Sequence, residues 1–167
     1  MVQVFKYLLQ DDGVFPNSKF PVIIYRNAFN FPLPQDPEKI EKIFALNDWT
    51  NSRRNGIYYL HHYHSIVHEV LGIYSGSCDL ILGGEKGIQF TVNIQDVIII
   101  PAGVAHKNAG ATHDFKCVGA YPDGKSFDIN YGKPGERPET DKNIQKVLLP
   151  EADPVFGAEG QLFQFWN

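Results

Sequence analysis

The order of apolar and polar residues divides the chain into three zones. The first zone, residues 1–55, contains short extended stretches followed by a helical pattern. Asp36 is a suitable N-cap, Pro37 fits the first helical position, and apolar residues follow at helical spacing. We therefore predict a helix over residues 37–46 that packs outside the main body of the fold.

The second zone, residues 56–121, consists of short β-branched and aromatic runs separated by Gly, Asn and Asp. Residues 80–94 have the pattern of a hairpin. Residues 97–100 form a continuous apolar run that ends at Pro101, which is typical of a strand buried on both faces. Many short strands without helices between them predict an all-β sandwich or small barrel with minor helices.

The third zone, residues 122–167, begins with a stretch that is rich in Gly, Pro and charged residues. This stretch predicts a long ordered arm or lid. It leads to the aromatic run 162–166, which we expect to be a closing strand, because exposed aromatic residues at a frayed end would favour aggregation. Together the three zones predict one domain over residues 1–167.

Composition narrows the range of partners and compartments. Apolar residues make up 43 % of the chain and charged residues 20 %, and the formal net charge is -4. This balance gives no positive field for nucleic acid. No apolar run reaches the roughly 18 residues that span a bilayer, and the N-terminus lacks the features of a signal peptide. We expect a cytoplasmic protein without membrane or nucleic-acid partners, in which Cys78 and Cys117 are buried free thiols.

Four of the six histidines lie within residues 61–70. If residues 61–64 form a strand, the period of two places His62 and His64 on one face, and His61 and Tyr63 on the other. A His-x-His pair chelates a metal ion when its face points into a cavity. The spacing therefore makes His62 and His64 candidate metal ligands.

Two further side chains are able to reach the same point. Glu69 follows His64 by five residues, far enough for a tight turn to return it on the next strand, and His106 follows the turn after the buried strand. Three imidazoles and a carboxylate suit one divalent transition metal ion, and Fe, Mn, Ni and Zn all remain open as its identity. Four protein ligands on an octahedral ion leave positions for water, substrate or dioxygen, which favours chemistry over a structural role.

The spacing of these residues resembles both motifs of the cupin superfamily. The two motifs read Gly56-x5-His62-x-His64-x4-Glu69-x6-Gly76 and Pro101-x-Gly103-x2-His106. Gln95 stands where the family usually has Gly, and Gly110 where it usually has Asn. These departures concern turn positions and leave the candidate ligands intact.

The likeness extends over nearly the whole chain. The stretches NDWTNSRRNGIYY, HHYHSIVHEVLG, PAGVAHK and GAYPDGKSFDI resemble the YjlB-like group of single-domain cupins. This resemblance implies a double-stranded β-helix, also called a jelly-roll barrel, with a bound metal ion and usually a dimer. It implies nothing about the substrate.

The fourth ligand has two candidates in adjacent positions. Cupins tolerate either three or four residues between the second histidine and the last ligand of the first motif, so His68 is an alternative to Glu69. Glu69 matches the spacing to Gly76, and adjacent strand residues point to opposite faces. We therefore expect Glu69 to face the metal, and His61 and His68 to point away toward a surface or a subunit contact.

The candidate functions are an enzyme, a ligand-binding protein and a structural cupin with a vestigial histidine cluster; the complete ligand set argues against the third. An enzyme would perform oxygenase, isomerase or lyase chemistry on a small metabolite, with Tyr58 and Tyr121 as candidate catalytic residues. Nearby cations are able to hold an anionic substrate group; the candidates are Arg54, Lys107 and Lys125. The alternative is a small-ligand-binding or sensor cupin without catalysis, and in either case we expect a homodimer.

Overall fold

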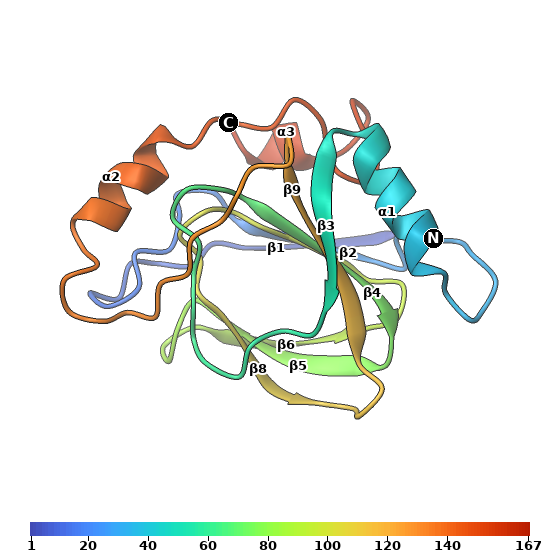
Figure 1. The fold of residues 1–167 in the computed structure, drawn as a ribbon, viewed down its shortest axis with the longest axis horizontal. Coiled ribbons are helices and arrows are strands. Elements are labelled where there is room, and N and C mark those ends of the chain that lie inside the picture. The colour runs from blue at the N-terminus through green and yellow to red at the C-terminus, as the bar shows by residue number, and fades with distance from the viewer.

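A computed structural model describes residues 1–167, and its strands form two antiparallel sheets that face each other (Figure 1). The six-stranded sheet has the order β1-β2-β7-β4-β9-β3, and the three-stranded sheet has the order β6-β5-β8. The strands are β1 (Gln3–Tyr7), β2 (Val22–Arg26), β3 (Trp49–Asn55), β4 (Glu69–Ser75), β5 (Ser77–Leu82), β6 (Ile88–Asn93), β7 (Val97–Ile100), β8 (His106–Ala111) and β9 (Lys116–Pro122). The predicted all-β jelly-roll fold is confirmed.

The hairpin and the strand buried on both faces, which are predicted in the second zone, are also confirmed. β5 and β6 form the expected antiparallel hairpin, in which Ser77 pairs with Asn93 and Leu82 with Ile88. β7 lies inside the six-stranded sheet between β2 and β4, and all four of its side chains are buried. A strand in this position has no solvent-facing side, which explains its continuous apolar run.

The six-stranded sheet therefore has two apolar faces. Its inner face packs against the three-stranded sheet, and Ile98 and Ile100 of β7 belong to this inner cluster. Its outer face carries a second cluster, which includes Val97 and Ile99 of the same strand. The alternation of side chains along a strand thus distributes one apolar run over two cores.

Helix α1 (Pro37–Leu46) covers the outer face, as the sequence predicts (Figure 1). The Asp36 carboxylate accepts a hydrogen bond from the Glu38 backbone N–H at 2.9 Å, which caps the helix. Ile40 and Phe44, one turn apart, are fully buried against the sheet. The predicted helix and its position are confirmed.

The C-terminal run is a short helix, α3 (Leu162–Phe165), and the predicted closing strand over residues 162–166 is wrong. A helical turn places Leu162 and Trp166 on one side, and both are buried in the outer cluster. The Trp166 indole N–H donates to the Pro21 carbonyl at 2.8 Å, and the ring stacks on Phe20. The aromatic residues do anchor the C-terminus, but through helical spacing.

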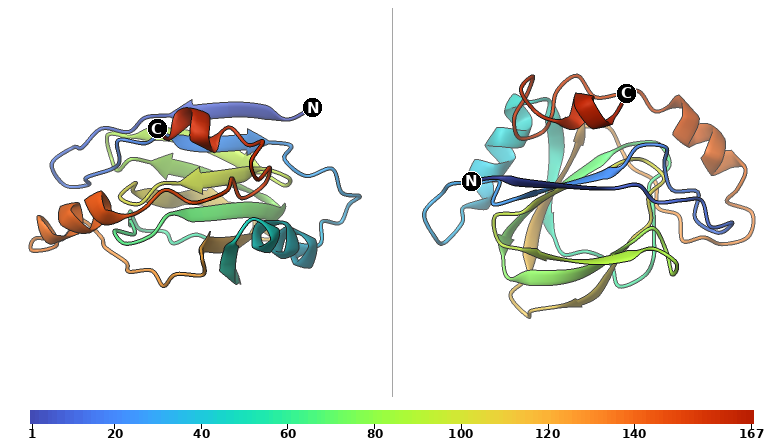
Figure 2. Two further views of the ribbon diagram at one scale, coloured as in Figure 1. Left: turned by 90° about the horizontal axis from the view of Figure 1, so that it is seen from above. Right: turned by 180° about the vertical axis from the view of Figure 1, so that it is seen from behind.

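Figure 2 shows α3 close to β1, and the Lys6 ammonium lies 4.6 Å from the centre of the Phe165 ring.

The segment predicted to be an arm contains helix α2 (Glu139–Lys146) (Figure 1). Before α2, Asn130 forms an isolated β-bridge with Tyr63 and so attaches the arm to the histidine-rich segment. None of the three helices combines the length and the apolar composition that crossing a membrane requires.

Gln95, which departs from the second cupin motif, adopts the backbone conformation that glycine favours. Its φ is 79°, and its N–H donates to the Ile73 carbonyl at 2.9 Å while its carbonyl accepts from the Ala28 N–H at 2.8 Å. A non-glycine residue in this region carries a cost of about 1–2 kcal/mol. The turn before β7 therefore keeps its geometry at some cost in stability.

Candidate metal centre

The segment 61–64 alternates as predicted, although it is no continuous strand. Only isolated bridges form here, from His62 to His106 and from Tyr63 to Asn130. His62 and His64 point into the barrel, whereas Tyr63 packs against Phe15 on the other side. The two bridges are sufficient to impose the period of two.

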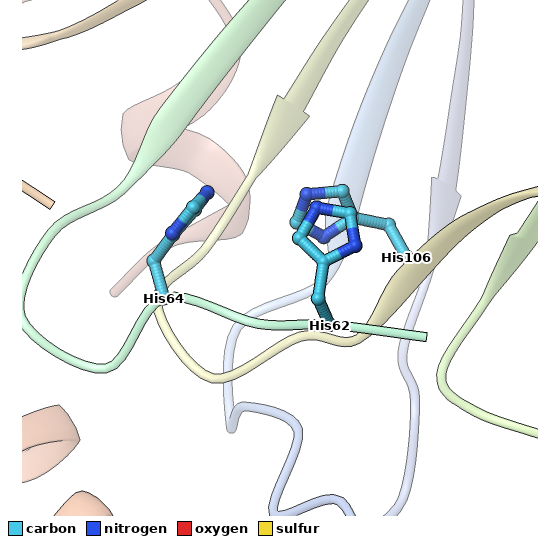
Figure 3. A group of neighbouring side chains, drawn as sticks. All are labelled: His62, His64 and His106. Atoms are coloured by element: carbon cyan, nitrogen blue, oxygen red, sulfur yellow. The ribbon is translucent and has the colours of Figure 1, made fainter. Parts of the chain in front are cut away.

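The imidazoles of His62, His64 and His106 converge in the barrel interior (Figure 3). All three residues are buried, and each offers one ring nitrogen within 4.8 Å of the others. The backbone amide groups of His62 and His106 hydrogen-bond to each other, at 3.2 Å and 2.9 Å. This bridge fixes ligands from two distant segments of the chain side by side.

The other ring nitrogen of each histidine is held by a backbone carbonyl. Nδ1 of His62 contacts the Leu60 carbonyl at 2.8 Å, and Nδ1 of His106 contacts the Val104 carbonyl at 3.0 Å. Nδ1 of His64 contacts the Asp128 carbonyl. A carbonyl oxygen only accepts, so Nδ1 carries a proton in all three rings, and Nε2 is the atom that a metal ion would bind in the neutral ring. This is the tautomer and the second contact that metal-binding histidines generally have.

Glu69, the first residue of β4, places its carboxylate beside two of these rings. Its Oε1 lies 3.4 Å from His106 Nε2, and its Oε2 lies 3.5 Å from His64 Nε2. The Tyr121 hydroxyl donates to Oε2 at 2.7 Å and fixes the orientation of the carboxylate. The carboxylate and the three imidazoles form a donor set that fits a first-row divalent metal ion.

His68 points to the opposite side of the sheet from Glu69. Its ring packs 4.8 Å from Trp166, and its Nδ1 accepts from the Ala102 N–H at 2.9 Å. His68 is therefore buried against the C-terminal segment, rather than at a surface. The structure brings Glu69, and not His68, to the three histidines. His61 also points away and packs against Phe15, with ring centres 5.6 Å apart.

Burial and mutual contact perturb the titration of the cluster. Burial, together with the neighbouring His106, lowers the pKa of His62 to about 3, so this imidazole is neutral and able to act as a ligand. Burial alone would raise the pKa of Glu69, but His64 and His106 hold it well below its ordinary value. Burial alone would lower the pKa of His64, but the Glu69 carboxylate raises it.

The cluster lies in a cavity of about 70 Å³ at one end of the barrel. This small volume admits a small ligand rather than a large cofactor. The cavity is lined by Arg53, Asn55, Gly56, Ile57, Tyr58, His62, His64, Glu69, Leu71, His106, Cys117, Gly119, Tyr121 and Phe127. Cys117 and Cys78 are buried free thiols, as predicted.

Both candidate catalytic tyrosines line the cavity. The Tyr121 hydroxyl is occupied by Glu69, and burial together with that carboxylate raises the pKa of Tyr121. The Tyr58 ring lies 5.0 Å from the His62 ring and is 52 % exposed. Tyr121 is thus placed to position a ligand, and Tyr58 to meet a molecule at the entrance.

Arg53 is the cation at the cavity entrance. The prediction that Arg54 lies there is wrong. Arg54 points outward, where it binds Glu41 of α1. Lys107 and Lys125 are also absent from the cavity lining. Sequence reasoning missed Arg53 because β3 has a register shift between Thr50 and Arg53, which reverses the alternation of side chains.

The arm supplies a second wall that sequence reasoning also missed. Phe127 packs against the rings of His64 and Tyr121, with centres 5.0 Å and 5.1 Å away. The Asp128 carboxylate accepts from the Ser65 N–H at 2.7 Å and from the Ser65 hydroxyl. The arm therefore holds the loop after His64 in place. No local pattern in the sequence marks Phe127 or Asp128 for this position.

The chain is similar in sequence to a known protein over almost its whole length. The chain is 38 % identical over 161 residues to YjlB of Bacillus subtilis (strain 168), a protein described as uncharacterized, and the match covers 96 % of this chain and 94 % of YjlB. No protein-family model matches the chain.

Solved structures with related folds are much more distant in sequence. RmlC from Streptococcus suis, in a complex with dTDP-D-xylose, is 13 % identical with a TM-score of 0.42, over 87 % of this chain and 94 % of that one. Procruciferin, an 11S globulin from Brassica napus, is 14 % identical with a TM-score of 0.38; the match covers 68 % of this chain but only 23 % of the globulin. Scores this low support no inference about function. From its identity to YjlB over almost the whole of both chains, and with its jelly-roll fold, the chain belongs to the YjlB family of cupins.

Proposed function

We propose that this protein binds one divalent transition metal ion through His62, His64, Glu69 and His106, and acts there on a small metabolite. The observation that supports this proposal most directly is the shared contact of the three Nδ1 atoms with backbone carbonyls. These contacts leave the three Nε2 atoms facing one cavity. Three buried imidazoles and a buried carboxylate that meet in one cavity are an expensive arrangement without a bound cation.

The metal ion would supply Lewis-acid polarisation or oxygen activation. The protein's own residues would orient the ligand and control protons. Tyr121 would keep the Glu69 carboxylate in one orientation through its 2.7 Å hydrogen bond, and Phe127 would exclude water from that side. Tyr58 would be a proton donor or acceptor at the entrance, because the residue is half exposed and its ring packs beside His62.

Elemental analysis of protein purified without an affinity tag tests the metal site. We expect roughly one equivalent of Fe, Mn, Ni or Zn per chain, because the ligand set has a single centre. The double variant His62→Ala/His106→Ala should contain only traces and should remain folded. Trace metal in the wild-type protein, after both aerobic and anaerobic reconstitution, would contradict the proposal.

Oxygen consumption then separates the possible reactions. If iron is bound and a pool of small metabolites stimulates oxygen uptake, the protein is an oxygenase. If zinc, nickel or manganese is bound and uptake does not change, isomerase or lyase chemistry remains. The alternative is a sensor that holds metal and ligand without turnover, and it would be favoured if a bound molecule is recovered unchanged after prolonged incubation.

The proposal also includes a homodimer. β1 is an edge strand of the six-stranded sheet, with β2 on one side and no partner strand on the other. Such an edge is able to pair with the same edge of a second copy. Light scattering during size-exclusion chromatography tests this, and a monomeric mass at micromolar concentration would contradict it.

A further inference from the structure

Arg53 extends to the cavity entrance without a protein partner for its charge. Its guanidinium lies 4.9 Å above the centre of the Phe127 ring and forms no salt bridge and no hydrogen bond with the protein. An arginine has five N–H donors in a planar fork that matches a carboxylate. All of them are available to a molecule in the cavity.

The neighbouring Arg54 is in the opposite situation. Its guanidinium donates to Glu41 Oε1 through both Nε, at 2.9 Å, and Nη2. Ser52 also contacts Glu41, on the same outer side of β3. Of these two adjacent arginines, one is neutralised on the outer side and the other brings an uncompensated charge to the cavity.

The strand opposite Arg53 leaves room for a ligand. Arg53 pairs with Gly119 of β9. A Cβ added at Gly119 would lie 3.8 Å from Glu69 Oε2 and 3.9 Å from the Tyr121 hydroxyl oxygen. The absence of a side chain at Gly119 therefore opens a space that adjoins both Arg53 and the candidate metal centre.

The exposed Arg53 side chain packs its guanidinium against an aromatic wall. Phe127 stacks on Tyr121 with an angle of 25° between the rings, and Tyr121 holds Glu69. Arg53, Phe127 and Tyr121 thus form one wall from the entrance to the cluster. A guanidinium held against a ring loses less conformational freedom when it binds an anion, which strengthens recognition.

The charges of the cavity favour an anionic ligand. Its lining contains one acidic residue, Glu69, which is in contact with His64 and His106, and one arginine, Arg53, which has no acidic partner. We infer that the ligand of this cavity is a small carboxylate, whose carboxylate group binds Arg53 in the space over Gly119. This inference rests on the proposed metal-dependent function, because it names the ligand class of the same site.

Calorimetric titration of the full-length protein with malonate tests the inference. Malonamide, which has the same shape without charge, is the control ligand, and Arg54→Gln is the matched control variant for Arg53→Gln. We expect malonate to bind to the wild-type protein and to Arg54→Gln. Binding to Arg53→Gln should be weaker by roughly tenfold or more, as expected for the loss of a charged hydrogen-bonded pair. Malonamide should bind none of them measurably.

A second variant tests the location, because it does not touch Arg53. Gly119→Ala places its methyl group in the space over Gly119 at ordinary contact distances, the closest being 3.5 Å from Leu71 Cδ2. The variant should fold normally, and malonate binding should fall by roughly tenfold or more. Thermal unfolding of each variant verifies that it is folded.

Metal content of the same samples separates the two proposals. Unchanged metal with equal malonate affinity in the wild-type protein and Arg53→Gln would overturn the carboxylate inference and leave the metal site standing. So would metal-loaded wild-type protein that does not bind malonate. If no sample holds metal, the proposed function fails. Malonate binding that still requires Arg53 would then support the anion site without the metal. If malonate does not bind either, the anion site is overturned as well.

Discussion

The inner and outer faces of the six-stranded sheet are both buried, but they are covered by different partners. The outer face packs mainly against apolar side chains of α1 and the C-terminal segment, and Tyr25 also donates to the buried Asp153 carboxylate there. The inner face is apolar along most of its length and becomes polar at one end, where Glu69 joins the histidines. Glu69 and His68 are adjacent, yet they belong to different faces. The difference indicates that both faces contribute apolar packing, whereas the candidate chemistry lies at one end of the inner face.

The largest expected effect is on the outer face. Phe44→Ala should lower the free energy of unfolding by about 3–5 kcal/mol, because a fully buried aromatic ring leaves a cavity between α1 and the sheet. Urea unfolding measures this loss. Leu46→Ala, on the same helix but 83 % exposed, should change stability by less than about 0.5 kcal/mol. A large loss of bound metal from folded Phe44→Ala would show that the two faces are not independent.

Two glycines on neighbouring strands sharpen the comparison. At Gly72 an added Cβ would meet Ile40 Cγ2 at 2.9 Å and Phe44 Cζ at 3.0 Å, on the outer face. Gly72→Ala should therefore cost about 1–3 kcal/mol of unfolding free energy through overpacking. Gly119→Ala, on the inner face, meets only ordinary contacts and should be close to the wild type in the same urea experiment. Equal losses in the two variants would contradict the asymmetry.

On the inner face, ligand removal should affect metal binding more than folding. His106→Ala and His62→Ala should each lower metal affinity roughly tenfold or more, measured by competition with a chelator. Their stability without metal should change little, because the barrel core consists of other side chains. His68→Ala is the control on the outer face and should keep its metal. If either ligand variant unfolds completely, the metal has a structural role.

The smallest effect is expected at Tyr121. Tyr121→Phe removes the hydroxyl that holds Glu69 and nothing else. The loss of one hydrogen bond is worth about 1 kcal/mol, which corresponds to a decrease of about fivefold in metal affinity. The same chelator competition measures it. An unchanged affinity would show that the carboxylate keeps its orientation without Tyr121.

The sequence predicts features that depend on local periodicity and misses those that depend on register or distant packing. The alternation over residues 61–64 separates His62 and His64 from Tyr63 correctly, because two isolated bridges preserve it. The helical turn at Leu162 has a pattern that fits a strand equally well, and burial of Trp166 decides the outcome. Phe127 reaches the cavity through the path of the arm, which no local pattern encodes.

The register shift in β3 also sets how the entrance is able to change during evolution. Two residues stand between Thr50 and Arg53, opposite a single residue of β9, and Asn51 within this bulge has a φ of 58°. Deletion of one codon within the bulge would leave one residue opposite one, and both Trp49 and Arg53 would keep their present sides of the sheet. A deletion between Arg53 and the end of β3 would not have this property, because the residues beyond it would change sides. The bulge is therefore a place where the length of β3 is able to change by one codon without loss of the arginine at the entrance.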